Sequence, residues 1–132
     1  MNIIRTFLAL SLFSVLTAAC QESLEDRCQR EAADYTRKHC PMRIDEFTVL
    51  DSMSFDKPTH TISYIYSLKG YADDSAAFNK VSPRELLLKE VKNSTQLKLY
   101  KEAGYSFRYV YYSTQRKGTR LFEATFHEKD YR

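Results

Sequence analysis

The stretch THTISYIYSLK, residues 59–69, carries the clearest strand pattern in the chain. Every second side chain is large and apolar, and these side chains fall on one face: Ile62, Tyr64, Tyr66 and Leu68. A period of two is typical of a half-buried strand, because successive side chains of a strand point to opposite faces. The stretch therefore predicts a strand with one face in the core.

Similar patterns lie on either side of this stretch. Residues 44–55 precede it and are separated from it by the turn Asp56-Lys57-Pro58, so we expect a hairpin. Further along the chain, residues 105–113 and 121–127 alternate in the same way. Gly118 lies between them and can adopt the positive φ that a tight turn requires. These two segments predict a second hairpin.

A first helix is predicted over residues 24–39, where apolar side chains recur every three or four positions before Pro41. Cys28 and Cys40 lie within this segment and at its end. About twelve residues of helix rise about 18 Å, whereas a disulfide needs Cα atoms within about 7 Å. Export favours oxidation of such a pair, but the helix predicts that these cysteines do not bond to each other. A later helix start, near Glu31, would allow the bond.

A second helix is predicted to begin at Ser82-Pro83-Arg84-Glu85. In this reading Ser82 is the N-cap, Pro83 takes the first helical position and Glu85 completes a capping box. A buried stripe is expected to follow, made of Leu86, Leu87, Leu88 and Val91. A short helix through 97–103 should then end at Gly104.

The elements predict an α+β fold in a single domain, residues 24–132, with the order helix, hairpin, helix, hairpin. Each hairpin has an apolar face that it cannot bury alone. The simplest solution is one four-stranded antiparallel sheet with both helices packed on one face.

Residues 1–19 have the layout of a secretory signal peptide. Arg5 lies near the start, an uncharged stretch follows, and the segment ends in the small residues Thr17-Ala18-Ala19. The uncharged run is short for a membrane-spanning helix, which needs about 20 apolar residues. The sequence therefore predicts an exported protein.

The segment Leu16-Thr17-Ala18-Ala19-Cys20 resembles the lipobox of bacterial lipoproteins, with Thr17 where the usual pattern has Leu. The resemblance implies that Cys20 is the lipidation site, that residues 20–23 form a lipidated tether, and that the membrane is a partner through this anchor. Gln21 then favours the outer membrane of the cell envelope. The alternatives are an ordinary signal peptide cleaved after Ala19 and an uncleaved anchor.

The composition indicates little chemistry. The 20 basic and 17 acidic residues are interspersed, so no basic block suggests nucleic acid. The three glycines are scattered, which excludes a glycine-rich phosphate loop. His39, His60 and His127 belong to three different elements, and Asp45 and Asp51 are expected in turns and on the surface. We therefore predict no catalytic residue, no metal site and no cofactor.

Tyrosine is abundant, with ten residues in the chain, and most of the strand tyrosines are expected to pack in the core. Arg108 and Tyr112 fall on the strand face opposite Phe107 and Tyr109. Because interfaces favour Tyr and Arg, we predict that Arg108 and Tyr112 lie on a binding surface.

The domain also resembles small exported bacterial proteins of unknown function, through the pattern of Pro41, Asp45, Thr48 and Asp51 followed by Tyr64-Ile65-Tyr66 and Tyr109-Val110-Tyr111. The sequence favours a non-catalytic binding or structural module with an envelope protein as its partner. The alternatives are a small periplasmic hydrolase or carbohydrate-processing enzyme, and an immunity-type lipoprotein.

Acylation of Cys20 is directly testable. Cells that express the full chain and are fed a fatty-acid probe should label the wild type, and Cys20→Ser should lose the label because the acceptor sulfur is gone. Equal labelling of both proteins would contradict the lipoprotein reading.

Overall fold

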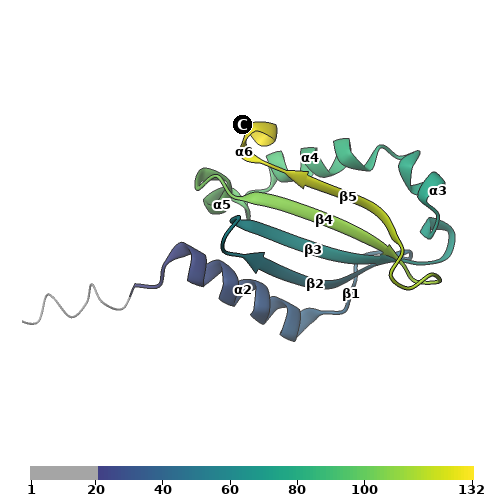
Figure 1. Ribbon diagram of the computed structural model, residues 1–132, viewed down its shortest axis with the longest axis horizontal. Coiled ribbons are helices and arrows are strands. Elements are labelled where there is room, and N and C mark those ends of the chain that lie inside the picture. The colour runs from purple at the N-terminus through teal and green to yellow at the C-terminus, as the bar shows by residue number, and fades with distance from the viewer. Residues whose placement is uncertain (1–20) are drawn as a thin grey trace, which may run out of the picture.

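One mixed five-stranded sheet forms the centre of the computed structural model, which describes residues 21–132 (Figure 1). Cys20 and the predicted signal peptide lie outside the described residues. The helices and strands, in chain order, are α2 (Leu24–His39), β1 (Met42–Arg43), β2 (Thr48–Asp56), β3 (Thr61–Leu68), the 3₁₀ turn η2 (Gly70–Ala72), α3 (Ser75–Asn79), α4 (Pro83–Asn93), α5 (Lys98–Glu102), β4 (Ser106–Ser113), β5 (Arg120–Phe126) and α6 (Glu128–Tyr131).

The predicted α+β class is confirmed, but the prediction of a four-stranded antiparallel sheet is wrong. The strands follow the order β1-β2-β3-β4-β5, and β3 pairs with β4 in parallel. The two hairpins, β2–β3 and β4–β5, are neighbours in the sheet, and the strands that join them, β3 and β4, run in the same direction. Parallel neighbours need a long crossover connection, and residues 69–105 supply it with α3, α4 and α5.

A fifth strand, β1, also differs from the expectation. The segment predicted as one strand over 44–55 begins as β2 only at Thr48, and Met42–Arg43 folds back to pair with Val49 and Leu50. A two-residue strand carries too few alternating side chains to produce a recognisable pattern.

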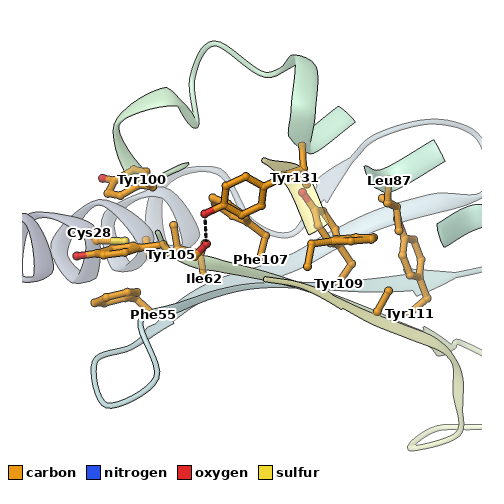
Figure 2. Close-up of a cluster of buried hydrophobic side chains, with 14 of the residues drawn as sticks. Cys28, Phe55, Ile62, Leu87, Tyr100, Tyr105, Phe107, Tyr109, Tyr111 and Tyr131 are labelled. Carbon is orange, nitrogen blue, oxygen red and sulfur yellow. Dashed lines mark hydrogen bonds between the residues drawn. The ribbon is translucent and has the colours of Figure 1, made fainter. Parts of the chain in front are cut away.

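The helices cover one face of the sheet, as predicted. One core cluster joins side chains of α2, α4, α5 and α6 to the same face of the strands (Figure 2). Its fully buried members include Leu68, Val91, Phe107 and Phe126. Phe107 and Phe126 are register partners on β4 and β5. The opposite face of the sheet has no helix on it within the described residues (Figure 1).

α2 is a continuous helix, so the predicted first helix is confirmed. Ser23 caps it by accepting a hydrogen bond from the Asp26 amide at 3.1 Å. Cys28 is buried and Cys40 is half-buried, and both are free thiols. Thr36 Oγ1 accepts a hydrogen bond from the Met53 amide at 2.8 Å and donates one to the Met53 carbonyl at 2.9 Å. This side chain therefore pairs both backbone groups of Met53 at the outer edge of β2.

The predicted capping box at the start of α4 is wrong. Ser82 is the N-cap and Pro83 is in the first turn, but Ser82 has φ 52° and ψ 59° and its side chain makes no capping hydrogen bond. The left-handed backbone turns the chain into the helix and directs the hydroxyl away from the orphan amides. The predicted stripe is also narrower than expected, because Leu87 and Val91 are buried while Leu86 is 54% exposed.

The conformation of Ser82 gives a stability prediction. Ser82→Gly should raise the free energy of unfolding by about 0.5–1 kcal/mol, because glycine avoids the cost of a Cβ at positive φ but adds entropy to the unfolded chain. Ser82→Ala should change it by less than about 0.5 kcal/mol, since no side-chain hydrogen bond is lost. Urea denaturation measures both. A loss of about 1 kcal/mol in Ser82→Ala with no gain in Ser82→Gly would instead indicate a capping hydroxyl.

Candidate functional site

An apolar groove of about 400 Å³ lies between α2 and the segment that leads into α5. Strands β2 and β3 form its floor, α2 forms one wall, and Gln96, Leu97 and Tyr100 form the other. Met42 and Ile44 lie at the end nearest β1, and Ile44 is 49% exposed. This volume falls in the range of ligand-binding clefts, about 300–1,000 Å³.

Tyrosines make the floor of the groove stiff. Tyr64 and Tyr66 of β3 line the groove, and each stacks on its parallel register partner in β4. The ring centroids are 4.9 Å apart for Tyr64 and Tyr109 and 4.6 Å apart for Tyr66 and Tyr111. A tyrosine has only two side-chain torsions, so stacked rings present a preformed surface.

Glu31 ties the two walls together at the other end of the groove. Its carboxylate accepts hydrogen bonds from Tyr100 Oη on α5 and from Arg27 Nε on α2, each at 2.7 Å. Figure 2 shows Tyr100 above Cys28 and Tyr105. The ring centroids of Tyr100 and Tyr105 are 5.6 Å apart. The hydrogen bond from Tyr100 to Glu31 holds α5 beside α2, and the stack of Tyr100 on Tyr105 supports it from the start of β4.

Three titratable side chains of the groove, Glu31, Cys28 and Tyr66, have shifted pKa values. The Arg27 guanidinium bonded to Glu31 lowers the pKa of that carboxyl, so Glu31 stays ionised. Burial raises the pKa of the Cys28 thiol to about 11 and that of Tyr66 to about 12, so both stay protonated. A general base works best with a pKa near the working pH. The groove is therefore better suited to binding than to acid–base catalysis.

A second apolar hollow of about 300 Å³ follows the groove along β2 and β3. Thr48 and Leu68, which are register partners, line it from the sheet. Tyr71 and Val81 line it from the crossover segment, and they are 79% and 55% exposed. The two hollows together are lined along β3 from Ile62 to Leu68. These two residues are themselves buried, and Tyr64 and Tyr66 between them are partly exposed.

Arg108 and Tyr112 lie where the sequence placed them, on the sheet face that the helices leave open. Arg108 Nε donates to Glu123 Oε1 at 2.6 Å, and Arg120 binds the other oxygen of that carboxylate. Val110, between Arg108 and Tyr112 on the same strand, is fully buried although no helix covers it. Long side chains therefore already cover much of this face. Binding by Arg108 and Tyr112 stays a prediction.

The histidines do not gather. His39 packs against Tyr35 and His60 contacts Glu25. His127 Nδ1 lies 2.9 Å from Ser106 Oγ, in a shallow hollow with charged side chains around it. Across residues 21–132 no carboxylate forms a hydrogen bond with the His127 ring, which leaves this Ser–His pair without the third member of a hydrolase triad.

The acidic residues singled out from the sequence have local roles. Asp45 accepts a hydrogen bond from the Phe47 amide at 2.8 Å in the turn before β2, and Asp51 binds the Ser67 hydroxyl across the β2–β3 ladder. The part of the chain that the structure describes holds no cluster of three or more His, Cys, Asp or Glu side chains suited to a metal ion. Within the same part, no helix is both long and apolar enough to cross a membrane.

Sequence reasoning missed the groove. Its floor was predicted correctly as a core-facing set of tyrosines, but its walls come from segments far apart in the chain. Ile44 was placed inside a strand, and Leu97 inside a short helix. The one usable signal was the pair Met42 and Ile44, two apolar residues between a helix-ending proline and the start of β2.

Comparison with known proteins places the fold. The profile of a family described as a domain of unknown function (DUF8479) matches residues 23–122. No curated protein matches the chain. Among solved structures, a Pseudomonas aeruginosa protein described as secreted is similar at a TM-score of 0.65 and 15% identity, over 85% of this chain and 100% of that one. The pilotin of the Vibrio vulnificus type 2 secretion system is similar at a TM-score of 0.59 and 12% identity, over 83% of this chain and 92% of that one.

The two thiols give a chemical probe of the groove. In the folded domain lacking Cys20, we expect iodoacetamide at pH 8 to modify Cys28 at least about tenfold more slowly than Cys40, because Cys28 is 3% exposed and its thiolate is scarcer. Mass spectrometry of digests taken over time measures both rates. After unfolding without reductant, two alkyl groups should be added. Equal rates in the folded protein would contradict the buried position of Cys28, and no alkylation after unfolding would reveal a disulfide.

Proposed function

We propose that this chain, which belongs to the DUF8479 family, is a lipid-anchored, non-catalytic module of the bacterial envelope that binds an apolar helical segment of a partner protein. The groove between α2 and α5 carries the proposal. It is a stiff, open, apolar concavity whose ionisable groups are held in fixed charge states. Exposed apolar surface on a small domain marks an interaction site.

The floor of the groove favours a helix over an extended peptide. β3 is paired on both sides, and the outer edge of β2 is satisfied by β1 near Leu50 and by Thr36 at Met53. An extended segment inserted here would find the backbone groups at Leu50 and Met53 already paired. A helix satisfies its own backbone hydrogen bonds and can lay an apolar face into such a groove.

The dimensions indicate the length of the bound segment. From Ile62 to Leu68 the strand spans about 20 Å, at about 3.3 Å per residue. A helix of that length has about 13 residues, at 1.5 Å per residue. An amphipathic segment of three to four turns would therefore cover both apolar hollows along β3.

Two observations support a location in the envelope: the N-terminal sequence and the proteins in which a similar fold occurs. Residues 1–20 combine a signal-like stretch with a terminal Cys20. The fold also occurs in a protein described as secreted and in a pilotin of a secretion system. Both similarities support an exported protein, and the similarity to a pilotin supports a role in binding an envelope protein.

A peptide titration tests the groove. An isotopically labelled domain would receive a 14-residue amphipathic peptide built with a 3.6-residue period of leucine on a polar background. We expect amide shifts confined to the residues lining the groove. Ile44→Glu should weaken binding by about tenfold or more, which corresponds to about 1.4 kcal/mol, because it places a charge in the apolar rim. Gln115→Glu adds the same charge in an exposed turn and should leave the affinity unchanged.

Two further arms decide between surfaces. A scrambled peptide of the same composition should bind weakly, because its apolar side chains no longer share a face. Tyr112→Ala tests the open sheet face. A loss of affinity in Tyr112→Ala with none in Ile44→Glu would contradict the groove proposal. Equal affinity of the domain for the amphipathic and the scrambled peptide would contradict it as well.

A further inference from the structure

The segment that joins Cys20 to the domain is held against α2. The Glu22 carboxylate receives two hydrogen bonds from the Arg30 guanidinium, from Nε at 2.8 Å and from Nη2 at 2.9 Å. The next residue, Ser23, is fixed as the helix cap. The pairing with Arg30 lowers the pKa of Glu22, which keeps the carboxylate ionised at neutral pH. Between the proposed lipid anchor and the folded domain, Gln21 is the one residue not tied to α2 by these bonds.

Chain length limits how far the domain can stand from the anchor. An extended chain spans at most about 3.6 Å per residue, so the whole of residues 21–23 reaches about 10 Å. Exposed ion pairs are weak, typically 0–1 kcal/mol, but a bidentate pair adds directional restraint. The short tether sets the distance to the membrane, and the pair between Glu22 and Arg30 restricts the orientation.

The same pole of the domain carries the β2–β3 turn and α5 (Figure 1). Lys57 of the turn bonds to Asp26 at 2.6 Å, and His60 lies 2.7 Å from Glu25. These contacts occupy the carboxylates in the first turn of α2. The cations of Lys57 and Arg30 offset the charges of Asp26 and Glu22, which reduces the repulsion between these two carboxylates and an anionic lipid surface.

α5 presents apolar and basic side chains at this pole. Tyr100 fixes α5 to Glu31, which lies about 10 Å along α2 from Leu24 at 1.5 Å per residue. Leu99 is 44% exposed. Lys98 beside it is largely solvent-facing, and its Nζ lies 3.5 Å from the exposed Glu102 carboxylate on the same helix. An exposed leucine flanked by lysine is suited to the boundary between headgroups and acyl chains.

We propose that the anchor holds this domain with the α5 pole against the membrane surface, so that Leu99 and Lys98 contact the lipid. The inference rests on acylation of Cys20 in the proposed function. The β4–β5 turn lies at the opposite end of the sheet from α5 (Figure 1). The groove then runs along β3 away from the bilayer, and a partner helix bound in it would stand at a steep angle to the membrane.

Site-directed fluorescence on the full lipidated chain tests this orientation. A Cys40→Ser background leaves only Cys28, which is buried and should react slowly, because the sulfur of an acylated Cys20 is blocked. An environment-sensitive fluorophore would be placed at Lys98→Cys or at Lys117→Cys in the β4–β5 turn. The protein would be reconstituted in vesicles of phosphatidylethanolamine and phosphatidylglycerol that contain a headgroup-nitroxide lipid. We expect a blue shift and strong quenching at position 98, and neither at position 117.

Two variants test the tether itself. A flexible Gly-Ser insertion of about 12 residues after Gln21 reaches about 20 Å and should abolish the quenching at position 98. Arg30→Ala should weaken it, whereas Arg37→Ala, an exposed arginine on the same helix, should not. Protein that sediments with vesicles but is quenched equally at both positions, or at neither, would overturn the orientation and leave the anchor intact. Protein that stays in the supernatant would overturn the anchor and the orientation together.

Discussion

The parallel pairing of β3 with β4 is the constraint on which the rest of the structure depends. Because the two strands run the same way, the chain must cross the sheet between them, and residues 69–105 do so on the face that α2 already covers. That crossing brings α4 and α5 to the same side as α2. It gives the groove its second wall, and no helix of residues 21–132 lies on the opposite face.

The groove keeps its shape through contacts that its own lining residues make. Glu31 and Tyr100 fix the distance between α2 and α5, and the stacked pairs Tyr64–Tyr109 and Tyr66–Tyr111 give the floor a shape that cannot collapse inward. Closing the groove would require breaking these contacts. We propose that another molecule covers this apolar concavity, and this is the physical basis of the proposed function.

The candidate site was only partly predictable from sequence. Alternation placed Arg108 and Tyr112 on the face opposite the helices, and the structure agrees. The structure also shows that Arg108 donates a hydrogen bond to Glu123. The groove escaped prediction because α2, β3 and Leu97 come together only in the folded chain, and no local pattern encodes their distance. The prediction of a capping box at Ser82 failed for a related reason. A capping motif specifies residue types, but the crossover imposes a left-handed backbone conformation on Ser82 that these residue types do not indicate.

The sequence by itself determined the longer helices and strands and their buried faces, because period-two and period-3.6 repeats report directly which side of a segment meets the core. The export signal stays a prediction. The sequence could not determine which strands are neighbours or in which direction they run. A strand alternates in the same way whether its partner is parallel or antiparallel, so the hairpins alone fit several sheets. Only the tertiary structure decided between them, because the path of the crossover depends on packing Leu87, Val91 and Tyr100 onto the tyrosine floor, an interaction between residues far apart in the chain.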